Sequence, residues 1–139
     1  MLSLIHISQT RTFLYTGSDL TSATNPENGT VTYTYDSGHH VTSRTDAIGN
    51  QTQYSYDAYG RLTEVQYYPN GGVENTFQRV NYYYDNNVPP AYSGSKPANG
   101  IGRQTGVGFG GGVKDSVYDA HYYTYVYSYN CLLYTSRCV

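Results

Sequence analysis

Aromatic and polar residues alternate with a period of two in several short stretches of the chain. The segments Tyr33–Tyr35 and Tyr54–Tyr56 each hold two rings two residues apart, with Thr34 or Ser55 between them. In a strand both rings lie on one face, whereas in a helix they would lie about 200° apart. The alternation therefore predicts strands.

Turn-forming residues separate these predicted strands. In the segment Asp57–Gly60, Asp can accept bonds from amides ahead of it, and Gly can adopt the left-handed conformation that ends a tight loop. The segment Asp36–Gly38 has its glycine one position earlier, so we expect a different turn there. Leu62 and Val65 lie slightly out of the alternation, which indicates a β-bulge between residues 61 and 67. Further turn signals at 25–29, 46–50 and 69–72 complete an all-β prediction, an antiparallel meander of short β-hairpins.

The tetrapeptide Tyr-x-Tyr-Asp recurs in a common frame. Its copies at 33–36 and 54–57 lie 21 residues apart, and a third copy at 82–85 follows after 28 more. A Pro-, Gly- and Asn-rich loop is predicted at 86–100, after which 102–107 repeats the pattern of 60–65 and 127–130 resembles a degenerate copy. A fixed period is typical of repeat architectures, in which one unit needs neighbours to bury its apolar face.

The two ends of the chain differ from the repeat region between them. The nucleotide string CTGTCTCTTATACACATCT encodes residues 2–7 in one frame and residues 131–136 in the next, and its reverse complement begins with codons for residues 137–139 and a stop. The string resembles the end of a transposase-based sequencing adapter. We therefore interpret 1–8 and 131–139 as translated adapter and 9–130 as the β array. Both cysteines, Cys131 and Cys138, fall in the suspect tail, so neither a disulfide nor a redox compartment follows from them.

Composition narrows the possible functions. The chain has 19 Tyr, 3 Phe, no Trp and 15 Gly, and only 13% of its residues are charged. The net charge of −2 leaves no basic stripe, so we expect no nucleic-acid partner. No apolar run approaches the roughly 20 residues of a membrane-spanning helix, so we expect no membrane span.

Several residues that could carry chemistry have simpler interpretations as structural residues. His39, His40 and His121 could bind a metal, but adjacent histidines on a strand point to opposite faces, so we expect surface or turn positions. The glycine-rich run at 106–112 lacks the Lys-Ser/Thr of a phosphate loop, so we expect a flexible turn. Asn28 and Asn50 match the glycosylation pattern, yet both also lie in turn sequences.

The aspartates and arginines of the motif have the same kind of interpretation. Asp36, Asp57 and Asp85 stand just before turns, where we expect them to cap turn amides rather than form a catalytic carboxylate row. Arg61 and Arg103 follow turn glycines in matched positions and are expected to bond a neighbouring Asp. No nucleophile, base and orienting group can be assembled from these residues, so we expect no enzymatic activity, no metal and no cofactor.

The decapeptide Tyr54–Thr63, in phase with a second copy, resembles the YD repeat of the Rhs family. The resemblance implies a long β-sheet that spirals into a hollow shell around a C-terminal toxin or other cargo, in a secreted or cell-surface bacterial protein. The implied partners are adjacent repeats and the enclosed cargo; an adhesin that binds cell-surface carbohydrate is the alternative. We assign structural roles in the repeat motif to Tyr33, Tyr35, Asp36, Gly38, Tyr54, Tyr56, Asp57, Gly60, Arg61, Thr63, Tyr82, Tyr84, Asp85, Gly102, Arg103, Thr105, Tyr127 and Tyr129.

Overall fold

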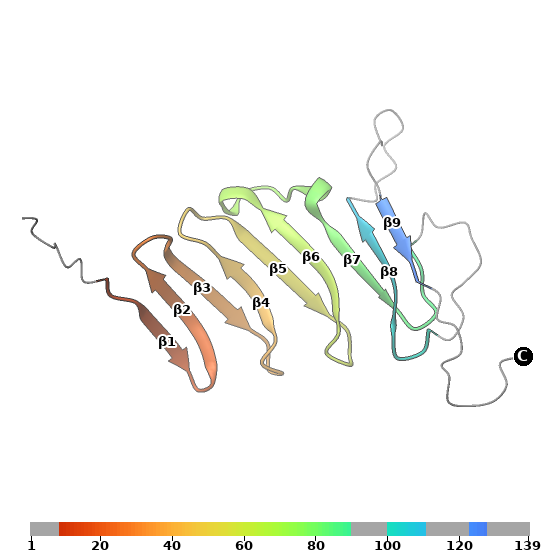
Figure 1. Cartoon of the computed structure of the whole chain (residues 1–139), viewed down its shortest axis with the longest axis horizontal. Helices are drawn as coiled ribbons and strands as arrows, with labels where there is room; N and C mark the ends of the chain where they lie inside the picture. The colour runs from red at the N-terminus through yellow and green to blue at the C-terminus, as the bar shows by residue number, and fades with distance from the viewer. Residues whose placement is uncertain (1–8, 90–99, 111–122, 128–139) are drawn as a thin grey trace, which may run out of the picture. The chain divides into compact units, whose positions relative to one another are not determined.

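The computed structural model describes residues 9–89, 100–110 and 123–127 (Figure 1). The two terminal segments interpreted as translated adapter, most of the loop at 86–100, His121 and Tyr129 lie outside these residues. Contacts divide the described chain into two compact units. The first comprises 9–53 and 68–73, and the second comprises 54–67 together with 74–89, 100–110 and 123–127.

The described residues form strands and two short 3₁₀ turns, which confirms the all-β prediction. The strands form one sheet in chain order, with antiparallel pairing from β1 to β5 and from β6 to β9, as expected for a meander of hairpins. The elements are β1 (Thr12–Thr16), β2 (Asp19–Asn25), β3 (Gly29–Tyr35), β4 (Val41–Thr45), β5 (Gln51–Tyr56), β6 (Leu62–Tyr68), the 3₁₀ turns η1 (Pro69–Gly71) and η2 (Thr76–Gln78), β7 (Val80–Tyr84), β8 (Gln104–Phe109) and β9 (Tyr123–Val126).

Strand β3 shows the predicted alternation most clearly. Its tyrosines Tyr33 and Tyr35 are half-buried, whereas Thr32 and Thr34 are exposed on the other face. On the face of Tyr33, the cross-strand pair Ala23 and Val31 is buried at 7% and 9% exposure. The first unit therefore has one apolar and aromatic face and one face of small hydroxyl residues.

Three hairpins carry a β-bulge at the same place in the repeat. In each, the extra residue is a threonine one position after the residue that pairs with the second aromatic: Thr21 in β2, Thr42 in β4 and Thr105 in β8. A bulge places an extra residue opposite its partner strand and increases the local twist. Thr63 is the corresponding residue of β6. The bulge expected between 61 and 67 stays a prediction, and Thr63 is the residue expected to form it.

The glycine-rich run corrects one expectation. Residues Gly106–Phe109 belong to β8, not to a flexible turn, and Gly106 and Gly108 are buried. A Cβ on Gly106 would lie 3.0 Å from Cδ of Pro89 and 3.1 Å from the carbonyl oxygen of Tyr125. The glycine is therefore needed because Pro89 and β9 approach the strand closely, which is a tertiary requirement that local turn propensity does not reveal.

Candidate functional site

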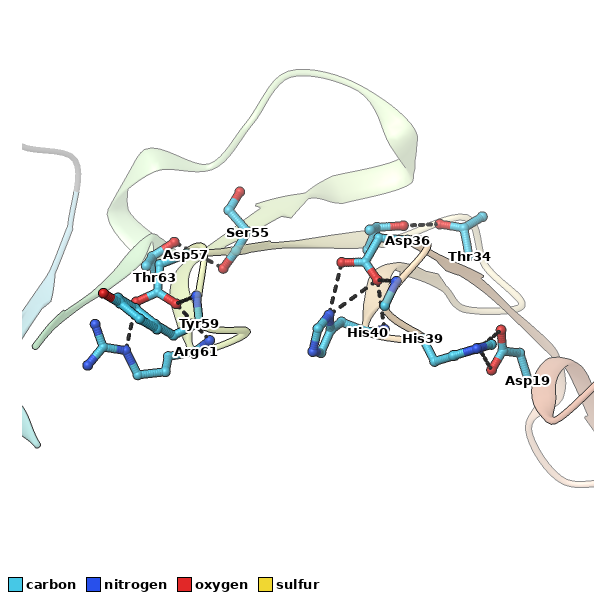
Figure 2. Close-up of polar contacts among 12 residues, drawn as sticks. Asp19, Thr34, Asp36, His39, His40, Ser55, Asp57, Tyr59, Arg61 and Thr63 are labelled. Carbon is cyan, nitrogen blue, oxygen red and sulfur yellow. Dashed lines mark hydrogen bonds and ion pairs between the residues drawn. The ribbon is translucent and has the colours of Figure 1, made fainter. Parts of the chain in front are cut away.

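The turns that end β3, β4 and β5 share one hydrogen-bond pattern. Each begins with an aspartate whose amide donates to the carbonyl four residues later, and whose carbonyl accepts the amide three residues later. The carboxylate also accepts two amides within each turn, and Figure 2 shows the turns of Asp36 and Asp57. These carboxylate bonds run from Gly38 and His40 to Asp36 (2.8 and 2.9 Å), from Ile48 and Asn50 to Asp46 (3.1 and 2.9 Å), and from Tyr59 and Arg61 to Asp57 (2.9 and 3.0 Å).

The turn at Asp36 therefore matches the others in its bonding, contrary to the expectation of a different turn. The fourth residue of each turn takes a positive φ: Gly49 at 88°, Gly60 at 73° and His39 at 64°. Gly38 is not the left-handed residue. A histidine holds that conformation instead, which a β-carbon disfavours.

These bonds lower the pKa values of the turn aspartates. At Asp36 the amide of His40 is the largest cause of the decrease. At Asp57 partial burial raises the pKa, but the amide and guanidinium of Arg61 outweigh it, and the pKa lies below its ordinary value. The same balance holds at Asp46, where Asn50 supplies an amide and a side-chain donor. The carboxylates are therefore held ionised as turn caps.

Asp85 closes a turn that is interrupted by the inserted loop. Its amide donates to the carbonyl of Arg103 at 2.9 Å, and its carboxylate accepts the amide of Gly102 at 2.8 Å. Gly102 has a φ of 73°, and the amide of Arg103 donates to Gly100. The predicted capping role of Asp85 is thus confirmed, with partners from the far side of the insertion.

Arg61 joins two hairpins of the second unit. Its Nε lies 2.7 Å from Oδ2 of Asp57, and its terminal nitrogens lie 3.3 and 3.0 Å from the carboxylate of Asp85. The guanidinium carbon lies 4.4 Å from the ring centroid of Tyr84 and 5.1 Å from that of Tyr59. These contacts raise the pKa of Arg61, first through Asp85. The bond to a neighbouring Asp is confirmed for Arg61 and stays a prediction for Arg103; the planar guanidinium of Arg61 is well suited to pairing with two carboxylates.

The second tyrosine of the motif also connects hairpins. The hydroxyl of Tyr35 donates to the carbonyl of Leu20 at 2.9 Å, and that of Tyr84 donates to the carbonyl of Leu62 at 2.8 Å. Leu20 and Leu62 lie two repeat periods apart. The same bond therefore recurs in both units, from the second tyrosine to the first apolar residue of the second strand of the preceding hairpin.

The bulge threonines and the corresponding residue Thr63 use their hydroxyls as well. Thr21 donates to the carbonyl of Leu14 at 3.2 Å, and Thr63 donates to that of Ser55 at 3.1 Å. Thr42 shares a 2.8 Å bond with the hydroxyl of Thr34. Thr105 is fully buried and donates to the carbonyl of Asn87 at 2.6 Å, which ties the start of the inserted loop to β8.

The remaining predicted motif residues are placed as follows. Tyr54, Tyr56 and Tyr82 are half-buried strand residues, and Arg103 is half-buried at the closed end of the split turn. Tyr127 follows β9 and donates its amide to the carbonyl of Thr105.

Sequence reasoning missed the equivalence of the Asp46 turn, although Asp46–Gly49 has the same Asp-x-x-Gly spacing as Asp57–Gly60. It also missed the pairing of His39 with Asp19.

Two open hollows accompany this framework, one in each unit. The first, of about 450 Å³, has Ala23 and Val31 in its lining together with Tyr33, Arg44 and other residues of the same unit. The second, of about 350 Å³, is lined by Asp57, Arg61, Tyr84 and neighbouring residues. Within the described part of the chain no three His, Cys, Asp or Glu residues are grouped as metal ligands, and no helix is long and apolar enough to cross a membrane.

Comparison with known families agrees with the geometry. The family model described as RHS Repeat matches residues 15–47 and, overlapping them, residues 36–73. These spans contain the turns of Asp36, Asp46 and Asp57 and the bond from Tyr35 to Leu20. No curated protein matches the chain.

Proposed function

This chain belongs to the Rhs repeat family, on the match over residues 15–73, and we propose that it is a non-catalytic structural segment of a large secreted or cell-surface bacterial protein. In this proposal the segment forms part of a β-shell that encloses or delivers a C-terminal toxin or other cargo domain. Its partners are the adjacent repeats of the parent chain and the enclosed cargo.

The observation that carries the proposal is the use of the motif residues. The hydroxyl of Tyr84, the guanidinium of Arg61 and the carboxylate of Asp85 all join one hairpin to another. Groups that are committed to structural partners in this way are poor candidates for attacking a substrate, because nucleophiles and bases must reach the reacting atoms. Residues that repeat the same contact along a chain are suited to extending a sheet.

The parent protein provides the test. Limited proteolysis of the full reading frame should leave the cargo protected, whereas removal of residues 9–130 should expose it to cleavage. A matched deletion of the same length outside the repeats should leave the protection unchanged. Cargo that stays protected without 9–130, or hydrolase or nuclease turnover by this segment itself, would contradict the proposal.

Carbohydrate binding is the second candidate, supported by the hollow of the first unit. Its lining combines the ring of Tyr33 with polar side chains of Asn25, Asn28 and Arg44. Aromatic faces stack on sugar rings, and amides and guanidinium groups can bond hydroxyls. Saturable binding on a glycan array that Tyr33→Ala removes and Tyr59→Ala preserves would favour this candidate, and absence of saturable binding would exclude it.

A further inference from the structure

His39 occupies a position of the repeat turn where the other two turns have glycine. Its φ of 64° is the left-handed conformation, whereas Gly49 and Gly60 adopt the same region without a β-carbon. A non-glycine residue in this region carries a conformational cost unless the surroundings hold it there. The contacts of the His39 side chain can offset this conformational cost.

The side chain of His39 reaches the preceding hairpin. Its Nδ1 lies 3.0 and 2.9 Å from the two carboxylate oxygens of Asp19, the first residue of β2 (Figure 2). The Asp19 side chain is 19% exposed and that of His39 is 68% exposed. The contact joins residues 20 positions apart within the first unit, next to the bond from Tyr35 to Leu20.

We propose that His39 and Asp19 form a pH-dependent latch that ties the β1–β2 hairpin to the turn between β3 and β4. The imidazolium form pairs with the carboxylate as an ion pair with a charge-assisted hydrogen bond, whereas the neutral form can keep an Nδ1–H hydrogen bond to the carboxylate but loses the ion pair. The latch is therefore closed when His39 is protonated. Deprotonation weakens this contact and leaves the bond from Tyr35 to Leu20 and the backbone pairing of β2 with β3 between the same two hairpins.

The two acidic neighbours of His39 both favour its protonated form. Asp19 faces it from β2, and Asp36 acts on it from its own turn; both raise the pKa of His39, Asp19 through the hydrogen bond first. The adjacent imidazole of His40 is bonded to Asp36 at 3.0 Å. A raised folded-state pKa means that the stabilisation is complete below the unfolded value of about 6.5 and is lost as the pH rises through the folded value.

Titration of His39 in the full chain by NMR tests the proposal. The His39 midpoint should lie above about 6.5, and Asp19→Asn should lower it toward that value. Glu27→Gln is the matched control, because that carboxylate pairs with Arg11 in the same unit and should leave the His39 midpoint unchanged. A His39 midpoint at the ordinary value, or one that Asp19→Asn does not move, would overturn the latch.

Hydrogen exchange provides a second readout that does not depend on variants of Asp19. Protection of the amides of β1 and β2, corrected for intrinsic rates, should decrease between about pH 6 and pH 8 in the native chain. His39→Gly removes both the latch and the conformational cost, so its protection should show no such decrease. A decrease that persists in His39→Gly would assign the pH dependence to another group and refute the proposal.

Discussion

The second tyrosine of two Tyr-x-Tyr pairs contributes a hydrogen-bond donor as well as aromatic surface. Tyr35 and Tyr84 are in different units, yet each donates its hydroxyl to the carbonyl of a leucine at the start of the second strand of the preceding hairpin. Burial raises the pKa of Tyr84, so its hydroxyl stays protonated and able to donate over the neutral range. Phenylalanine would provide the ring without this bond, which gives a reason for tyrosine at this position.

Tyr84→Phe should therefore destabilise the folded chain by about 1 kcal/mol, because the Leu62 carbonyl loses its donor while the packing surface remains. Chemical denaturation of the two proteins measures the difference. Tyr59→Phe is the matched control, since Tyr59 is 82% exposed and its ring, which faces Arg61, is retained. Equal losses for both variants would show that the Leu62 bond contributes nothing specific.

A second prediction concerns the buried hydroxyl of Thr105. Thr105→Val keeps the side-chain shape but leaves the Asn87 carbonyl without its donor, so the free energy of unfolding should fall by about 1–3 kcal/mol. Thr105→Ser keeps the hydroxyl and loses only a methyl group, and should cost less. Thermal unfolding of both variants compares them, and a Val variant more stable than the Ser variant would contradict the role assigned to the hydroxyl.

At the scale of elements, the repeated unit is a hairpin turn with a fixed set of bonds. In the turns of Asp36, Asp46 and Asp57 a carboxylate accepts two amides and the fourth residue takes a positive φ. A bulge threonine, Thr42, follows the Asp36 turn within β4. These features are local, so each turn can form before the sheet is complete. The contacts between hairpins, such as the bond from Tyr84 to Leu62 and the pairing of Arg61 with Asp85, join neighbouring hairpins within the sheet.

Gly49→Ala isolates the conformational term of such a turn. Space is available, because a β-carbon there would meet only Cα of Asn70 at 3.8 Å and the carbonyl carbon of Asn70 at 4.0 Å. The loss of stability, about 1–2 kcal/mol, should arise from the positive φ alone. Gly49→Asn, which tolerates this region better, should recover part of it in a denaturant titration; no difference between Ala and Asn would contradict the argument.

Most of this element-scale structure was predictable from the sequence, for identifiable reasons. The period-two tyrosines and the Asp-x-x-Gly spacing are local signals, and both led to the correct strands and turn caps. His39 was missed as the left-handed residue because glycine at 38 satisfied the local preference. The strand at Gly106–Phe109 was missed because Gly106 serves the close approach of Pro89. The split turn of Asp85 was missed because its partners come from across an insertion.

At the scale of the whole molecule, ionised carboxylates set the response to acid. The pKa values of Asp36, Asp46, Asp57 and Asp85 are all lowered, at Asp85 chiefly by Arg61. A lowered folded-state pKa contributes stability that is present above the unfolded value and is lost as pH falls through the folded value. Stability should therefore decrease below about pH 4.

Thermal melts followed by circular dichroism between about pH 2 and pH 6 measure this decrease. Asp57→Asn should flatten the acid limb, because it removes one carboxylate with a lowered pKa while an amide can still accept a turn hydrogen bond. Glu27→Gln, an exposed carboxylate paired with Arg11, should leave the limb nearly unchanged. An acid limb equally steep in native and Asp57→Asn proteins would count against the turn carboxylates as its source.

The split turn has a consequence for how such arrays acquire new sequences. Asp85 finds its amide and carbonyl partners at Gly102 and Arg103, although a long insertion separates them along the chain. In a hairpin closed in this way, the bonds between the residues on either side of the insertion set the pairing register of β7 and β8, and the inserted residues do not. We therefore expect segments of varied length to be tolerated between Pro89 and Gly100 while β7 and β8 stay paired, because Asn87 and Pro89 then keep their contacts with β8.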